Sequence, residues 1–477
     1  MSDAQRTLDL TASAAAQLGW LASGDVTAEA LLEAHVARSE QVNSRTNAVV
    51  ATDLAQARAA AAEIDRKRAA GDALGPLAGL PMTIKDSFDV NGMPAVCGNP
   101  DFANRATAVA DALAVARARE AGAVIWGKTN APFMAGDVQT FNKVYGVTNN
   151  PHDAARTSGG SSGGAAAALA TAVTPLEIGS DIGGSLRNPA HFCGVCSLKP
   201  TYGLIPDIGH VPPSPGLDMP PPDLNCVGPM ARNVADLELL FDVLAPDVAP
   251  LSTELTSLRE VRAALWFDEP AFFLSKTYRA ALGAVGEAVT AAGASVSEAR
   301  PEIDMEELFT VYTRLLLPII FSEAPKAMIG TVRALRPIFK ALGSSRYSLS
   351  NALATATQPE REFQEALSRR AAMKKACDAF FERHDVLIAP VTPTPAPPHN
   401  TKGLPYGRRI EVDGEKVPYL RQLDWIALAT ACHLPAVVIP TGKLDAGLPM
   451  GVQLIGREGD DRRLLAIAKL IEAQLAG

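Results

Sequence analysis

Two segments rich in glycine and serine carry serines that could act as nucleophiles. The first, SGGSSGG, covers residues 158–164, and the second, GSDIGGS, covers residues 179–185 and ends on Ser185. Glycines have no Cβ and let backbone N–H groups approach a substrate closely. Four consecutive amides in the second segment could converge on one oxyanion, those of Ile182, Gly183, Gly184 and Ser185. Each such donor is typically worth about 3 to 4 kcal/mol in the transition state. This pattern indicates acyl transfer to a serine.

The first segment taken alone fits three other interpretations. A flexible linker is typical of glycine–serine runs, but the alanines that follow favour an ordered helix. Gly159 and Gly164 have the spacing of a phosphate-binding loop, yet alanines stand at 165 and 166, where that loop needs Lys and Ser or Thr. Residues 160–164 also match G-x-S-x-G, which would make Ser162 the nucleophile of an α/β-hydrolase elbow. That elbow requires a strand before the serine, and residues 149–158 are turn-rich and polar.

A nucleophilic serine needs a base, and the sequence offers few. No Ser-x-x-Lys occurs, and His191 lies in an apolar segment with nothing to orient it. Lys85 is a lone cation in the apolar stretch LPMTIKD. Such a lysine is either paired with an acid, here Asp86, or neutral and functional. The residues by themselves leave both interpretations open.

Taken together, the motifs closely resemble those of the amidase signature family. Ser161 and Ser185 are 24 residues apart, and GLPMTIKD lies upstream of both. Supporting phrases are GKTN at 127–130, YGVTNNP at 145–151, FCGV at 192–195, LKPTYG at 198–203 and GLPMGVQLIG at 447–456. The resemblance is dense from about residue 74 to 240 and returns from about 385 onward. Thr157 and Ser158 stand where the family usually has proline before the GGSSGG run. The stretch APFMAGDVQTF after GKTN is an apolar version that lacks the particular acidic residue carried by many members.

The resemblance implies a Ser–cis-Ser–Lys triad. Ser185 would be the nucleophile and Lys85 the general base. Ser161, which would follow a cis peptide bond, would relay the proton from Ser185 to Lys85. The four amides around Gly183 would form the oxyanion hole. Lys85 can accept a proton only when neutral, and burial would lower its pKa from about 10.4 towards 7 or 8.

Four further residues are expected to support the triad. Asp181 and Arg187 flank the nucleophile, and we expect them to hold the loop, with a buried ion pair as one way to do so. Ser162 is expected to form a hydrogen bond within the same network. Gly160 is expected to ease the cis turn sterically.

The surrounding sequence predicts alternating strands and helices. Thr27 is expected to cap a helix, further helices are predicted at 52–70 and 111–120, and a last one after Asp460 or Asp461. The predicted strands cover 80–90, 123–130, 384–390 and 434–440. This alternation favours an α/β sheet with helices on its faces. The resemblance implies one large domain around a central mixed, twisted sheet covered by helices on both faces.

That domain is divided into four sections. Residues 1–72 form an N-terminal helical section, 74–240 a catalytic core, 245–380 a variable helical section on the substrate side, and 385–477 the return to the core. The proline-rich residues 211–222 are predicted to be a loop.

Composition narrows the classes of partner. The chain has 477 residues, 47% of them hydrophobic, and a formal charge of −8 without long runs of Lys or Arg, which argues against nucleic acid or an anionic membrane. The N-terminus lacks a secretory pattern and no apolar run approaches the roughly 20 residues of a spanning helix, so a cytoplasmic protein is expected. Cys193-x-x-Cys196 has no second ligand pair, and neither a metal nor a cofactor is expected. A homodimer is plausible for the family.

The leading hypothesis is an amidohydrolase that cleaves a small-molecule carboxamide through an acyl-Ser185 intermediate. An alternative is the glutaminase subunit of a tRNA-dependent amidotransferase. Those subunits typically read close to SSLDQIGP where this chain has PPPDLNCVGP at 220–229. A third hypothesis is an esterase using Ser162. The sequence does not distinguish aliphatic, aryl and amino-acid amides as substrates.

Overall fold

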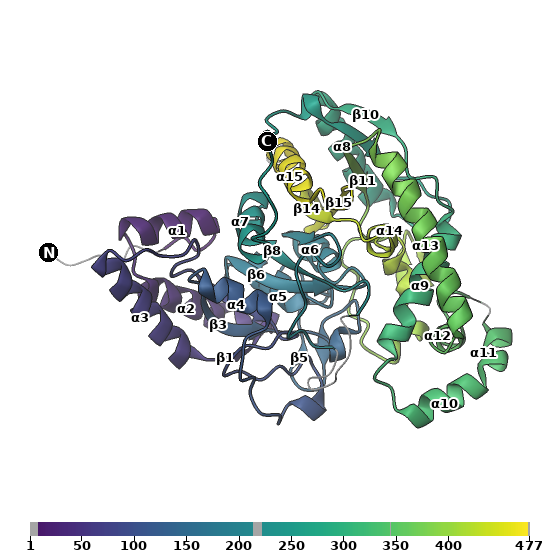
Figure 1. The fold of residues 1–477 in the computed structure, drawn as a ribbon, viewed down its shortest axis with the longest axis horizontal. Coiled ribbons are helices and arrows are strands. Elements are labelled where there is room, and N and C mark those ends of the chain that lie inside the picture. The colour runs from purple at the N-terminus through teal and green to yellow at the C-terminus, as the bar shows by residue number, and fades with distance from the viewer. Residues whose placement is uncertain (1–7, 213–221, 344, 476–477) are drawn as a thin grey trace.

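The computed structural model describes residues 8–212, 222–343 and 345–475, and a mixed sheet of 11 strands runs through it (Figure 1). The order across the sheet is β1-β3-β2-β6-β8-β7-β14-β15-β11-β9-β10. The strands are β1 Val49–Thr52, β2 Pro81–Lys85, β3 Val124–Thr129, β6 Leu176–Asp181, β7 Cys196–Lys199, β8 Cys226–Ala231, β9 Arg262–Leu265, β10 Ser295–Glu298, β11 Val386–Ala389, β14 Ala436–Asp445 and β15 Leu448–Ile455. The α/β class and the central mixed sheet are as expected.

Parallel pairing brings the ends of β2 and β6 together. β3, β2 and β6 pair in parallel, with Thr83 beside Glu177 and Ile84 beside Ile178. The carboxyl end of β2 therefore lies next to the carboxyl end of β6, and such an edge is where open α/β sheets bind ligands. All five residues of β2 are buried, as expected of a strand covered on both faces.

Helices cover both faces of the sheet. Alternate residues of β14 belong to different cores, Val437 and Ile439 to one and Ala436 and Val438 to the other. This is the side-chain alternation of a strand buried on both faces. On one face pack α4 Leu113–Glu120, α7 Val234–Leu244, α8 Lys276–Ala291 and α15 Asp461–Leu475. On the other pack α5 Gly163–Ala170, α6 Arg187–Cys193, α9 Met305–Ile320, α13 Glu360–Phe381 and α14 Ala427–Ala431.

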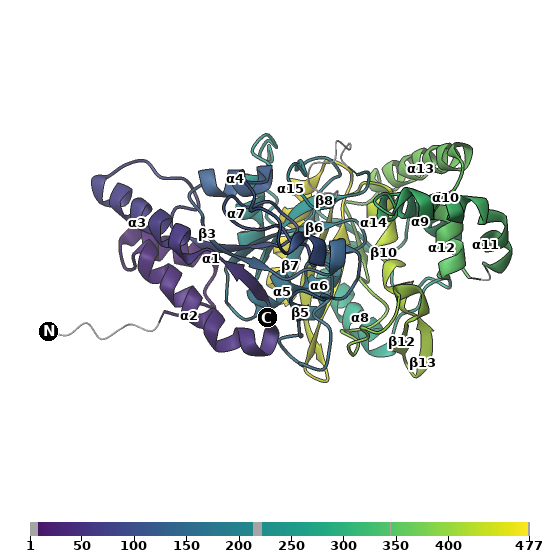
Figure 2. The same ribbon diagram turned by 90° about the horizontal axis from the view of Figure 1, so that it is seen from below.

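The remaining helices extend from the two ends of the molecule (Figures 1 and 2). At the N-terminal end lie α1 Ala14–Ser23, α2 Ala28–Thr46 and α3 Leu54–Ala70, and at the opposite end α10 Lys326–Ala334, α11 Arg336–Leu342 and α12 Leu349–Ala356. Thr27 caps α2 as predicted, because its side chain accepts a hydrogen bond from the amide of Ala30 at 3.1 Å. Two short hairpins complete the fold, β4 Phe141–Asn142 with β5 Gly146–Val147 and β12 Arg409–Val412 with β13 Glu415–Pro418.

The structure differs from the sequence predictions at several elements. The section at 245–380 is not purely helical, because β9 and β10 join the main sheet. The helix predicted from residue 52 begins at Leu54, since Asp53 caps it and residues 49–52 form β1. Most of the loop predicted at 211–222 lies outside the described residues.

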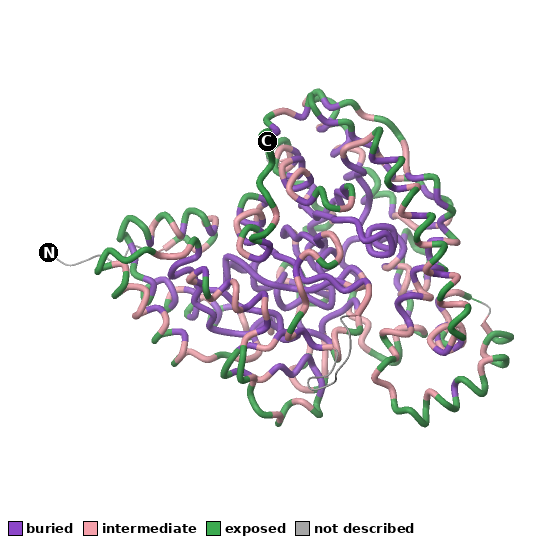
Figure 3. The backbone as a smooth tube through the Cα atoms, viewed as in Figure 1, coloured by how far each residue is buried: buried purple, intermediate pink, exposed green. Residues whose placement is uncertain are grey.

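Burial is concentrated where the sheet meets α5 and α6, whereas α10 and α11 are largely exposed (Figure 3). No helix among the described residues is long and apolar enough to cross a membrane.

Candidate active site

Lys85, the last residue of β2, lies in hydrogen-bond contact with two serines. Its Nζ is 2.7 Å from Oγ of Ser161 and 2.9 Å from Oγ of Ser180. Lys85 and Ser161 are fully or almost fully buried, and the structure thus places the proposed base directly against the proposed relay. Burial lowers the pKa of Lys85 from 10.5 to about 8, although the neighbouring Cys97 and Asp181 act in the opposite direction.

The alternative that Lys85 pairs with Asp86 is wrong. Asp86 instead forms a buried ion pair of 2.9 Å with Lys128 of β3. Nζ of Lys128 also donates to the carbonyls of Phe88, at 2.9 Å, and Pro94, at 2.7 Å. Adjacent residues at the end of a strand point to opposite sides, so Asp86 faces away from the serines.

Ser161 lies in the turn that leads into α5, and the peptide bond between Gly160 and Ser161 is cis. Close packing of backbone explains why residue 160 is a glycine, a reason other than the predicted easing of the cis turn. A Cβ at this position would lie 2.6 Å from the carbonyl oxygen of Asp137 and 2.7 Å from the amide nitrogen of Gln139. Another segment of backbone therefore packs against the turn too closely for any side chain.

Ser185 lies between β6 and α6, and its loop is tied to the turn that holds Ser161. The amide of Ser162 donates to the carbonyl of Ser185 at 3.1 Å. Ser185 is 5% exposed, against 1% for Ser161 and 0% for Lys85, so it is the most accessible of the three. This order of exposure suits a nucleophile nearer the surface and a more deeply buried base.

The oxyanion-hole prediction needs one correction. The amide of Gly184 donates to Oδ1 of Asp181 at 2.8 Å and is therefore already engaged. Within the described part of the chain, the amides of Ile182, Gly183 and Ser185 have no hydrogen-bond acceptor. Gly184 has a positive φ of 85°, which explains why glycine is needed there. We therefore leave Gly184 out of the candidate oxyanion hole.

Asp181 and Arg187 form a fully buried ion pair of 2.9 Å. Asp181 also accepts from the amide of Leu186 at 3.1 Å, and Arg187 donates to Gln453 at 2.8 Å and to Thr430 at 2.7 Å. Burial alone would raise the pKa of Asp181, but the Arg187 guanidinium outweighs it and the pKa falls to about 2. The pair is ionised at neutral pH and fastens the Ser185 loop to α14 and β15.

The surroundings of Ser162 lack the features of an elbow nucleophile. No strand precedes it within residues 149–161, all of which are described. Its Oγ lies 3.4 Å from the carbonyl oxygen of Ser180, and no base contacts it among the described residues.

Two residues at the site were not predicted, Ser180 and His210. Ser180 belongs to the GSDIGGS motif and lies in β6, two residues after Ile178, so the alternation of side chains along a strand could have drawn attention to it. His210 comes from the loop after β7, and no spacing in the sequence connects it with Lys85. Nε2 of His210 lies 2.8 Å from Oγ of Ser180.

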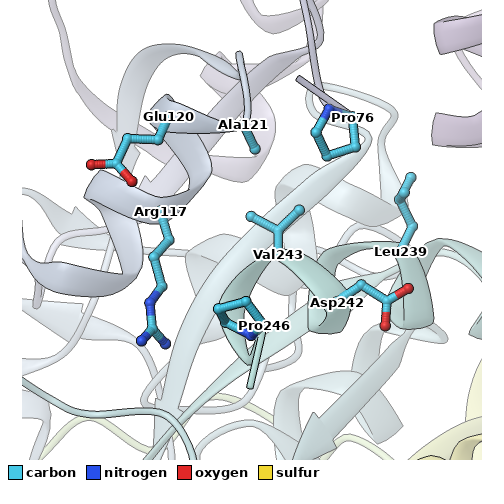
Figure 4. Close-up of a pocket in the computed structure, with 8 residues that line it drawn as sticks. All are labelled: Pro76, Arg117, Glu120, Ala121, Leu239, Asp242, Val243 and Pro246. Atoms are coloured by element: carbon cyan, nitrogen blue, oxygen red, sulfur yellow. The ribbon is translucent and has the colours of Figure 1, made fainter. Parts of the chain in front are cut away.

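Two other features of the described residues lie apart from the serine–lysine cluster. Cys193 and Cys196 are buried, and their thiols face different carbonyls, those of Ser158 and Arg232. A surface hollow of about 360 Å³ lies between α4 and α7 (Figure 4). It is lined by Pro76, Arg117, Glu120, Ala121, Leu239, Asp242, Val243 and Pro246. None of these residues belongs to the serine–lysine cluster.

Comparisons with known proteins show what the whole chain is similar to. Residues 30–465 match the protein family described as Amidase. The chain is 33% identical to a glutamyl-tRNA(Gln) amidotransferase subunit of Synechococcus sp. strain CC9605, over 97% of this chain and 96% of the relative. It is 32% identical to the AtzE subunit of 1-carboxybiuret hydrolase from Pseudomonas sp. strain ADP, over 95% and 96%. A crystal structure of an amidase superposes with a TM-score of 0.79 at 30% identity, over 97% of this chain and 100% of that one.

Proposed function

The chain belongs to the amidase signature family, hydrolases that act on C–N bonds, and from this premise we propose that it hydrolyses a small-molecule carboxamide through an acyl-Ser185 intermediate. The observation that carries the proposal is the 2.7 Å contact between Nζ of a fully buried Lys85 and Oγ of Ser161. Among the described residues no carboxylate forms an ion pair with Lys85, and a lysine in such surroundings is suited to take a proton from a hydroxyl.

In the acylation step, Oγ of Ser185 bonds to the amide carbon of the substrate. Its proton passes to Ser161, and the proton of Ser161 passes to the neutral amine of Lys85. The carbonyl oxygen becomes an oxyanion, which the amides of Ile182, Gly183 and Ser185 stabilise.

When the tetrahedral intermediate collapses, the C–N bond breaks. The leaving nitrogen takes a proton from Ser161, which regains one from the Lys85 ammonium. Water then attacks the acyl-Ser185 ester with Lys85 and Ser161 acting in the same order, and the carboxylic acid leaves. The proton that left with the nitrogen is replaced by one from the water, so Ser185, Ser161 and Lys85 all regain their starting protonation states and the cycle is complete.

A fluorophosphonate probe tests the nucleophile without knowledge of the substrate. All five candidate serines lie between Arg156 and Arg187, so trypsin releases them on one peptide and fragmentation must assign the adduct. We expect the adduct on Ser185, its loss in Ser185→Ala and its retention in Ser162→Ala. An adduct on Ser162 that persists in Ser185→Ala would contradict the triad and favour the esterase hypothesis.

Turnover is tested with a panel of aliphatic, aryl and amino-acid amides, assayed by release of ammonia or amine. We expect the purified chain to hydrolyse at least one member, and Lys85→Ala to lower turnover by about 100-fold or more, in the range of general base catalysis. Loss of less than about tenfold would show that Lys85 is not the base.

A second candidate function is that of a glutaminase subunit, and the identity to the amidotransferase relative favours it. Two relatives are named as subunits, which also bears on the expected partners of this chain. Glutamine hydrolysis that appears only with a co-purifying protein would support this function over the first. Amide hydrolysis by the purified chain alone would support the first.

A further inference from the structure

Lys85 contacts a second hydroxyl, and a buried histidine stands behind that hydroxyl. Nζ of Lys85 is 2.9 Å from Oγ of Ser180, which is 2.8 Å from Nε2 of His210. The other ring nitrogen, Nδ1, is 2.9 Å from the carbonyl oxygen of Pro212. A continuous chain of hydrogen bonds therefore runs from the loop after β7 to the candidate base.

The partners fix the direction of each hydrogen bond. A carbonyl oxygen can only accept, so Nδ1 of His210 carries the hydrogen that it donates to Pro212. In the neutral imidazole Nε2 then has no hydrogen and must accept from the hydroxyl of Ser180. With its one hydrogen used, Ser180 can only accept from Lys85.

We propose that His210 and Ser180 are positioning residues that aim the lone pair of neutral Lys85 at Ser161. A neutral amine has two hydrogens and one lone pair. Because Ser180 can only accept, an Nζ–H of Lys85 points to Ser180, and the lone pair is left for the hydroxyl of Ser161. This inference rests on the proposed function, since it concerns the same base.

Without the acceptor on His210, the hydroxyl of Ser180 could turn and donate to the Lys85 lone pair. That hydrogen bond would compete with Ser161 for the base. It would also favour the neutral amine, and the charged ammonium would lose an aligned acceptor. Loss of His210 should thus lower both the maximal rate and the pKa of Lys85.

The surroundings keep His210 neutral. Burial lowers the pKa of His210 to about 3, and the nearby Lys85 adds to this effect. Its ring packs edge-on against Phe88 at 5.0 Å. The other titratable groups near Lys85 are Cys97, Asp181 and Glu177. Burial raises the pKa of Glu177 to about 8, so this carboxyl titrates in the same range as Lys85 and needs its own control.

Two amide variants of His210 separate positioning from packing. In His210→Asn the side-chain amide can reach the position of Nδ1 and Pro212, whereas in His210→Gln it can reach the position of Nε2 and Ser180. We expect His210→Asn to lower the maximal rate of fluorophosphonate labelling at Ser185 by about tenfold or more. In the plot of labelling rate against pH, we expect the rising part at low pH, called the acidic limb, to move to lower pH. We expect His210→Gln to stay within about threefold of wild type, with the limb unmoved. Equal effects of the two variants would overturn the inference.

Non-additivity supplies a second readout. If His210 acts only through Ser180, the double variant Ser180→Ala/His210→Asn should be labelled no more slowly than Ser180→Ala alone. Effects that multiply would overturn the inference. If His210→Asn fails to fold, Ser180→Ala can be tested in the same way. An acidic limb in Ser180→Ala that is unchanged from wild type would also overturn the inference.

His35 of α2 provides a matched control. It is also fully buried and bonded at both nitrogens, 3.1 Å from the carbonyl oxygen of Val173 and 2.9 Å from Oε1 of Gln17. His35→Asn should lower the unfolding temperature without moving the limb, and a moved limb would overturn the inference. Failure of the proposed function looks different, because the wild-type chain itself would then neither be labelled at Ser185 nor hydrolyse an amide.

Discussion

The pH dependence of Ser185 reactivity follows from the burial of Lys85. The pKa of Lys85 is lowered from 10.5 to about 8 in the folded chain. This corresponds to about 3 kcal/mol against the ammonium form. As the proposed base, Lys85 would work only when neutral, and the neutral form predominates above the pKa. Reactivity should therefore rise with pH and level off above about pH 9.

The expected size of the rise distinguishes a buried base from an ordinary lysine. With a pKa near 8, the neutral fraction is about 9% at pH 7 and about 91% at pH 9, a tenfold rise. An unshifted lysine would give about a hundredfold rise over the same interval with no plateau. The assay is the second-order rate constant of fluorophosphonate labelling from pH 6 to 10, which does not depend on protonation of an amine leaving group.

Two control variants test whether the acidic limb of the labelling rate reports Lys85. Lys85→Ala should lose this limb. Glu177→Gln should keep a limb but move it to lower pH, because the Glu177 carboxylate raises the pKa of Lys85. A rate that is flat from pH 6 to 10, or a midpoint near 6.5 that survives Lys85→Ala, would refute the assignment of Lys85 as the base.

Three further predictions concern the buried charges, and urea or thermal unfolding tests each. Asp181→Asn leaves the Arg187 guanidinium buried without its carboxylate and should lower the free energy of unfolding by about 3 to 5 kcal/mol. A decrease below about 1 kcal/mol would contradict a structural role for the pair. Lys128→Met should lower the free energy of unfolding by a similar amount, because it leaves Asp86 buried without its partner, and adding Asp86→Asn should restore part of that loss. Losses that simply add in the double variant would argue against an ion pair between Lys128 and Asp86. Lys85 binds fewer protons in the folded than in the unfolded chain between about pH 8 and 10.4, so it contributes stability as pH rises through that window. Relative to wild type, Lys85→Met should lose about 3 kcal/mol across this window, and a constant difference would contradict the lowered pKa.

Local sequence patterns predicted elements whose signals lie within a few residues. Thr27 was predicted to cap a helix, and its hydroxyl accepts the expected hydrogen bond. The buried strand around Lys85 was visible because apolar and β-branched residues surround the single lysine of β2. By contrast β9 was missed, since a four-residue strand at the far side of the sheet is identified by its pairing partners and not by its own composition.

The sequence by itself determined the kinds of groups at the candidate site and the family to which they point. The residue types and order of the motifs around Lys85, Ser161 and Ser185 are characteristic of the family, and this resemblance implied a base, a relay and a nucleophile. Only the tertiary structure decided which partners these groups have. It assigned Asp86 to Lys128, engaged the amide of Gly184 with Asp181, and brought His210 to Ser180. The physical reason is that hydrogen bonds and ion pairs join groups that are close in space. The pairing of β2, β3 and β6 and the path of the loop after β7, which no local pattern specifies, bring Asp86 to Lys128 and His210 to Ser180.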